Sequence, residues 1–101
     1  MPFSPIDRPF DWEHVTATMQ VKSGPGMLHT ITINRGDPAA ATFITIYDGI
    51  GVTADIIANI ILDTAVFVIP QTLLFDTGFL AGLYVAFSGA VTLADLTVSY
   101  K

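Results

Sequence analysis

The chain has 101 residues, 51% of them hydrophobic, which fits one domain with a single core. Only 13% of the residues are charged, so polar side chains are scarce at the surface, and we expect apolar area to be buried between subunits. The net charge is −5 with four Lys and Arg in all, which disfavours binding to nucleic acid or to an anionic membrane. The absence of cysteine excludes disulfides and thiolate metal sites.

Residues 1–13 differ in composition from the rest, and we expect them to form an extended, Pro-rich arm ahead of a β-sandwich domain at 14–101. Proline fixes φ and removes backbone donors, so neither a helix nor a central strand suits this segment. It lacks a basic start followed by an apolar run, so we expect no secretory signal. The arm also carries four large apolar side chains, which we predict to be partner-binding: Phe3, Ile6, Phe10 and Trp12. The surface they cover is either their own sandwich or a neighbouring protein.

Residues 14–22 alternate between apolar and polar side chains, which predicts a half-buried strand. Ser-Gly-Pro-Gly at 23–26 predicts a turn, and 27–34 predicts a second strand that forms a hairpin with the first. Residues 42–47 are dense in β-branched and aromatic side chains and predict a third strand. The stretch 55–62 has isoleucines at helical spacing, but four β-branched residues in six favour a strand there.

Further strands are predicted at 65–69 and 72–75, on either side of Pro70, and at 83–87 and 93–100. The uncharged run 77–94 is nearly long enough for a membrane-spanning helix, but its glycines divide it into strand, turn and strand. Seven or eight short strands separated by Gly, Pro and Asp turns indicate an all-β, antiparallel two-sheet sandwich. Jelly-roll topology is one candidate for its strand order.

The acidic residues do not form a recognisable catalytic pair. Asp37, Asp48, Asp63 and Asp76 fall at predicted turns, where an Asp side chain caps its own backbone. No Gly-x-Ser-x-Gly motif, phosphate-binding loop or calcium loop occurs. We therefore expect no enzymatic activity, no catalytic residues, no cofactor and no metal site.

The two histidines, His14 and His29, lie on consecutive predicted strands, and a hairpin could bring them near each other. A metal site needs a third protein ligand, which nothing in the sequence indicates. His29 shares a predicted face with Ile31 and Ile33, so we interpret it as a core or interface histidine that donates to a carbonyl. A pH-sensitive subunit contact is the alternative.

Several segments of the chain resemble small β-sandwich structural proteins of tailed-phage virions. The resemblance covers 26–100 and rests on GMLHTITIN at 26–34, ATFITIYDG at 41–49, PQTLLFDTGF at 70–79, GLYV at 82–85 and LTVSY at 96–100. It implies a capsid decoration or cement protein, or a head-fibre or tail-associated component, that is made in the host cytoplasm and carried on the virion. It also implies a homotrimer without cofactor that contacts major capsid protein.

Two functions follow as expectations. The first is a structural virion protein that stabilises the capsid surface through protein–protein contacts, with copies of itself and the major capsid protein as partners and with no nucleic acid or membrane. The alternative is a binding module that recognises carbohydrate or a cell surface, for which Phe79, after Thr77-Gly78, is the candidate aromatic platform.

Overall fold

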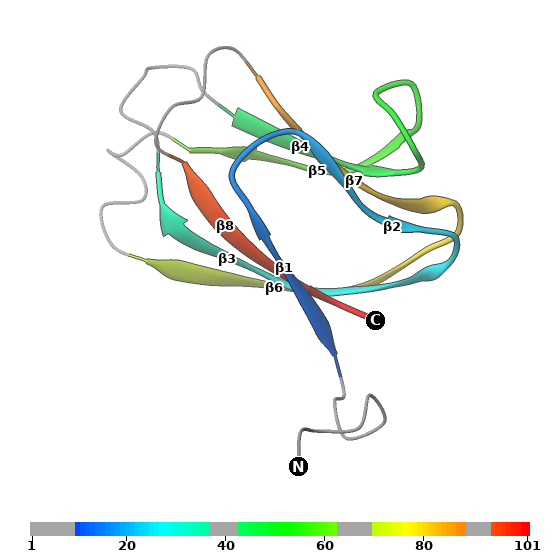
Figure 1. Cartoon of the computed structure of the whole chain (residues 1–101), viewed down its shortest axis with the longest axis horizontal. Coiled ribbons are helices and arrows are strands. Elements are labelled where there is room, and N and C mark those ends of the chain that lie inside the picture. Colours follow the sequence, from blue (N-terminus) through cyan, green and yellow to red (C-terminus); the bar gives the residue numbers. More distant parts are fainter. Residues whose placement is uncertain (1–9, 37–42, 63–69, 89–93) are drawn as a thin grey trace.

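The computed structural model describes residues 10–36, 43–62, 70–88 and 94–101 (Figure 1). In these residues the chain is all-β, and no helix long and apolar enough to cross a membrane occurs among them. The strands are β1 (Asp11–Val15), β2 (Met19–Ser23), β3 (Gly26–Arg35), β4 (Phe43–Asp48), β5 (Asp55–Ile61), β6 (Gln71–Phe79), β7 (Gly82–Phe87) and β8 (Asp95–Tyr100).

The described strands form two antiparallel sheets of four, which confirms the predicted two-sheet sandwich (Figure 1). Sheet A has the order β1-β8-β3-β6, and sheet B has the order β2-β7-β4-β5. Four of the pairings nest inside one another: β1 with β8, β2 with β7, β3 with β6 and β4 with β5. The chain is thus one long double-stranded ribbon that closes at the loop 49–54 and is rolled so that β3 also meets β8 and β4 also meets β7. This is the jelly-roll topology.

The core lies between the sheets and is made by alternate residues of each strand. Ile31 and Ile33 of β3 and Leu96 and Val98 of β8 are fully buried in sheet A, and they face Ile44, Ile46, Leu83 and Val85 of sheet B. Each such side chain stabilises the fold by about 1.5–3 kcal/mol relative to an exposed position. The residues between them point to the outer faces, so the register of the core also decides which side chains are available to a partner.

The prediction of one strand over 14–22 and of a hairpin with 27–34 is wrong. The chain bends at 16–18, where all three side chains are exposed, so β1 lies in sheet A and β2 in sheet B. β2 and β3 are also in different sheets, and the turn after Ser23 carries the chain across the sandwich. Val15 and Val21 are both buried, so the apolar pattern continues across the bend although the strand does not.

The strands predicted over 42–47 and 55–62 are confirmed as β4 and β5. The run 72–75 belongs to the longer β6, which continues through Asp76 and Gly78 to Phe79, while the strand predicted at 65–69 lies outside the described residues. Strand β1 begins at Asp11, so residues 11–13 of the expected arm pair with β8.

Candidate functional site

The predicted arm residues separate in the structure. Phe3 and Ile6 lie outside the described residues. Phe10 packs against the same chain: its ring stacks on the imidazole of His29, with ring centroids 4.1 Å apart and 4° between the planes. The ammonium of Lys101 lies 6.0 Å from the centroid of the Phe10 ring. Phe10 is therefore placed on its own sandwich.

Trp12 lies two residues further on, in β1, and its side chain is 61% exposed. It is paired with Ser99 of β8 and points away from sheet B, because the flanking positions Asp11 and Glu13 pair with Tyr100 and Val98 on the inner side. The sole tryptophan of the chain is thus fixed on a strand and open to a ligand.

The largest gathering of exposed apolar side chains lies on the β4–β5 hairpin. Of the eight large hydrophobic side chains that are exposed in the described residues, five belong to it, with exposures of 41–74%. We call these five the hairpin patch: Phe43, Ile50, Val52, Ile56 and Ile61. β5 is the edge strand of sheet B, and β4 is its neighbour in that sheet.

Strand register brings members of this patch together. Phe43 lies directly opposite Ile61 in the β4–β5 pair. Tyr47 lies opposite Ile56 on β5 and opposite Tyr84 on β7, and the two tyrosine ring centroids are 6.3 Å apart. Directly opposite side chains share a face, so an uncharged surface of aromatic and aliphatic groups continues from β5 onto β4 and β7.

A bulge in β5 explains why Ile56 faces outward. The pairing shifts between Ile46 and Tyr47 of β4, and Ile57 is the additional residue on β5. As a result Ile56 is exposed although Ile60, four residues on, is buried, while Ile61 is exposed by the ordinary alternation of the strand. Between them the side chains of Thr45 and Asn59 form a hydrogen bond of 2.7 Å, in which the hydroxyl donates to the amide oxygen. The bond ties β4 to β5 across the middle of the hairpin.

The loop 49–54 of the hairpin is anchored at its base. The Asp48 carboxylate accepts hydrogen bonds from the backbone N–H groups of Leu80 and Ala81, at 3.0 and 2.8 Å. These bonds hold the pKa of the Asp48 carboxyl below its ordinary value. The N–H of Gly49 donates to Gly82 at 3.0 Å, and the Gln20 side chain donates to the Gly49 carbonyl, also at 3.0 Å. The base of the loop is therefore held by β2, by β7 and by the turn between β6 and β7.

The histidines are not neighbours, because β8 lies between β1 and β3 in sheet A. His14 Nε2 lies 2.7 Å from Asp95 Oδ1, and His29 Nδ1 lies 2.5 Å from Asp76 Oδ1. His29 is partly exposed and bonded to a carboxylate, so the expected carbonyl partner and the core position are wrong, while the alternative of an interface histidine stays a prediction. Among the described residues no three His, Asp or Glu side chains gather as metal ligands would.

The prediction of Phe79 as an aromatic platform for carbohydrate is also wrong. It is 2% exposed and belongs to the core, because Asp76, Thr77 and Gly78 continue β6 and do not form a turn. The chain turns at Leu80 and Ala81 instead, and Leu80 is exposed. Neither the hairpin patch nor Leu80 stands out in the sequence, because an apolar run in a strand does not show which side chains face the core.

The molecule thus combines a jelly-roll sandwich, an apolar patch on an edge hairpin of sheet B, and an exposed tryptophan on sheet A. No protein-family model, curated protein or solved structure matches the chain.

Proposed function

We propose that this protein is a structural subunit that assembles through the hairpin patch, and that it serves as a decoration or cement subunit on the capsid of a tailed phage. The observation that carries the proposal is the concentration of exposed Phe43, Ile50, Val52, Ile56 and Ile61 on one edge hairpin. Exposed apolar side chains gathered on one element of a soluble domain mark an interaction site.

The chemistry of the patch suits a protein surface. Its side chains are aromatic or branched aliphatic, and the core of an interface between proteins is depleted in charge and enriched in such groups. Burying one of these side chains completely contributes about 1.5–3 kcal/mol. The bond between Thr45 and Asn59 and the anchored base of the loop limit the entropy lost on docking, because the surface is already ordered.

The virion part of the proposal rests on two supports. One is the resemblance of 26–100 to small sandwich proteins of tailed-phage particles. The other is the jelly-roll architecture, which viral capsid domains share with lectins and cupins, and this support is an analogy of fold. The partners we propose are copies of the chain, as a homotrimer, and the major capsid protein. The net charge of −5 does not oppose such contacts where the patch itself is uncharged.

Light scattering of the full chain over a range of concentrations tests the assembly. We expect an oligomer that dissociates on dilution, and we expect Ile56→Ser and Ile61→Ser each to weaken association by about tenfold or more. Leu74→Ser is the matched control, since Leu74 is at least as exposed as Ile56 and Ile61 but lies on sheet A. A monomer at every concentration would contradict self-assembly, and equal effects of all three variants would remove the hairpin patch from the interface.

Co-sedimentation with shells assembled from tailed-phage major capsid protein tests the virion role. We expect the wild-type chain and Leu74→Ser to sediment with the shells. We expect Ile56→Ser and Ile61→Ser, each as a single variant, to stay in solution. Failure of the wild-type chain to bind any such shell, while it still forms the oligomer, would overturn the capsid assignment and leave the subunit interface standing.

A further inference from the structure

The outer face of sheet A carries a second surface, which differs chemically from the hairpin patch. Two rows of side chains cross its four strands. We call this surface the hydroxyl face, and strand register defines its members: Trp12, Ser99, Thr30 and Leu74 in one row, and His14, Thr97, Thr32 and Thr72 in the next.

The placement of these side chains follows from the alternation of the strands. The positions that alternate with them on β3 and β8 include Ile31, Leu96 and Val98, and all three are fully buried. The hydroxyl face is therefore the side of sheet A that points away from sheet B. Four strands at about 4.8 Å spacing give each row a length of about 14 Å, which matches a short oligosaccharide.

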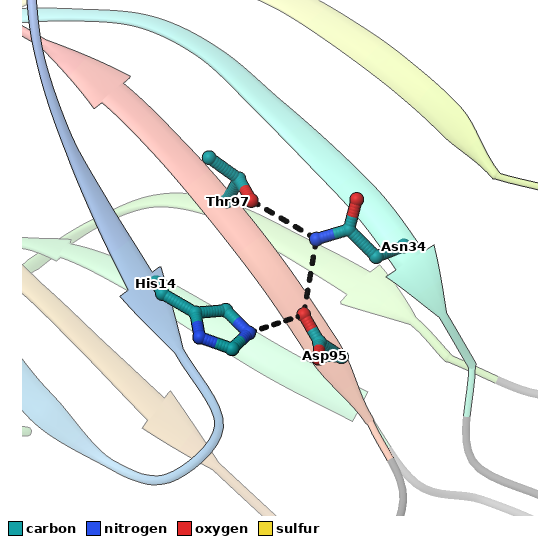
Figure 2. Close-up of polar contacts among 4 residues, drawn as sticks. All are labelled: His14, Asn34, Asp95 and Thr97. Carbon is teal, nitrogen blue, oxygen red and sulfur yellow. Dashed lines mark hydrogen bonds and ion pairs between the residues drawn. The ribbon is translucent and has the colours of Figure 1, made fainter.

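The hydroxyl groups are held in place by bonds within the face. Figure 2 shows side chains of three adjoining strands meeting at Asp95: its Oδ1 lies 2.7 Å from His14 Nε2 and accepts a bond of 3.0 Å from Asn34 Nδ2. Asn34 Nδ2 also donates to Thr97 Oγ1 at 2.9 Å. The hydroxyls of Thr32 and Thr72 are 3.0 Å apart. These bonds pre-order the row of His14, Thr97, Thr32 and Thr72 for hydrogen bonding.

Trp12 stands at one end of the first row, beside Ser99. Its strand is held at the start by the stacking of Phe10 on His29, so the indole projects from an anchored segment. An exposed indole offers a flat apolar surface with a polar N–H at its edge. A pyranose ring presents the complementary pattern, with C–H groups on its faces and hydroxyls at its rim.

We propose that the hydroxyl face binds a neutral oligosaccharide. One sugar ring packs on the Trp12 indole, and the sugar hydroxyls exchange hydrogen bonds with Ser99, Thr30 and Thr97, which act both as donors and as acceptors. The two rows contain no Lys, Arg, Asp or Glu, and Asp95 lies at the margin, so an uncharged ligand matches the face and a polyanion does not. The hydroxyl content favours a saccharide over a protein, whose interface core would be apolar. This site is independent of the proposed capsid role.

Because Trp12 is the sole tryptophan, its fluorescence reports occupancy of this site. The full chain is titrated with maltohexaose, cellohexaose, mannohexaose and chitohexaose, and binding is measured in parallel by calorimetry. We expect at least one of them to change the Trp12 emission saturably. We expect Trp12→Ala to weaken that binding by about tenfold or more in calorimetry, as loss of a central aromatic contact does.

A paired variant, Thr30→Val with Thr97→Val, removes two hydroxyls while keeping β-branched side chains in the strands, and we expect it to weaken binding as well. Ile61→Ser on the hairpin patch is the matched control and should bind as the wild type does. The proposal is overturned if none of the four saccharides binds, if binding survives Trp12→Ala, or if a sulfated polyanion such as heparin binds in their place.

Discussion

Both carboxylate oxygens of Asp48 accept a hydrogen bond from the backbone N–H of Leu80, each at 3.0 Å. One residue further on, Ala81 donates to Oδ1 of the same carboxylate at 2.8 Å. A side chain at the end of β4 thereby closes the turn between β6 and β7, which belong to different sheets. The contact links the two sheets at the base of the hairpin patch.

Replacing Asp48 with Ala should lower stability at neutral pH, because two N–H groups of the turn lose their acceptor. The bonds to Leu80 and Ala81 lower the pKa of Asp48 in the folded chain, so the stabilisation is present above the unfolded pKa of about 3.9 and is lost as pH falls through the folded value. We expect the difference in melting temperature between wild type and Asp48→Ala to be largest near neutral pH and to shrink in acid.

Asp55→Ala is the control for this measurement, because Asp55 lies opposite Asp48 on β5 and is exposed. Its removal should not reproduce the loss. A wild-type-to-Asp48→Ala difference that stays constant from neutral pH down to strong acid would show that the carboxylate charge is not the cause.

The stacked rings of Phe10 and His29 should be coupled energetically. Phe10→Ala and His29→Ala are each expected to destabilise the domain, and a double-mutant cycle in urea should give a coupling energy of about 0.5–1.5 kcal/mol. The stacking orders the chain just before β1, so both variants should also speed amide exchange in β1. Additive effects would mean that the contact contributes nothing and that Phe10 is free for a partner.

The sequence predicted the strands better than it predicted their partners. Strands β4 and β8 are local features, since β-branched residues and flanking turn residues specify an extended segment whatever it pairs with. Pairing depends on contacts far along the chain. The alternation of 14–22 is the same whether the chain runs straight or bends, so nothing in it indicates that Val15 and Val21 belong to different sheets.

The positions of the site residues likewise depend on strand pairing, which the sequence does not show. Trp12 stood out because a solvated arm has little use for an indole, but only its register with Ser99 shows the face on which it lies. Phe79 follows Thr77-Gly78, a pair that is typical of a turn but here belongs to β6. The burial of Phe79 depends on the pairing of β6 with Gly26, more than fifty residues away. Ile56 is exposed because of a bulge at Ile57, and a bulge has no reliable signal in an apolar run.

Tyr100 should make the domain sensitive to alkali. Burial, together with the charges of Asp11 and Glu13 on the adjoining strand, raises the pKa of its hydroxyl. A folded pKa above the unfolded value of about 10 stabilises the fold below that value, and the contribution is lost as pH rises through the folded pKa. We expect Tyr100→Phe to lose less stability than the wild type as the pH rises above about 10. Both proteins contain Tyr47 and Tyr84, so the difference between them reports Tyr100 alone.

The cause of the Tyr100 shift can be checked separately. Glu13→Gln removes one of the charges that act on the hydroxyl and should bring its pKa closer to the ordinary value, which the ultraviolet absorbance of tyrosinate measures against Tyr100→Phe as the blank. Thr97→Val lies on the opposite face of sheet A and should leave this titration unchanged. If Glu13→Gln leaves it unchanged too, the charge of Glu13 is not a cause, and burial and Asp11 account for the shift.

Gly26 should be intolerant of a side chain, although it begins a strand. A Cβ at this position would lie 2.3 Å from the carbonyl oxygen of Lys101 and 2.8 Å from the ring of Phe79, so the end of the chain and a core aromatic would both have to move. Overpacking of this kind costs about 1–3 kcal/mol. Lys101 and Met27 are joined by two backbone hydrogen bonds, of 2.8 and 3.0 Å, which the shift would strain.

Gly51→Ala is the matched variant, because a Cβ there meets nothing within 4 Å. We expect Gly26→Ala to lower the urea midpoint clearly and Gly51→Ala to stay within about 0.5 kcal/mol of the wild type. The pair also separates stability from function, since Gly51 lies between Ile50 and Val52 of the hairpin patch. A Gly26→Ala variant as stable as Gly51→Ala would mean that the end of β8 does not pack against the start of β3.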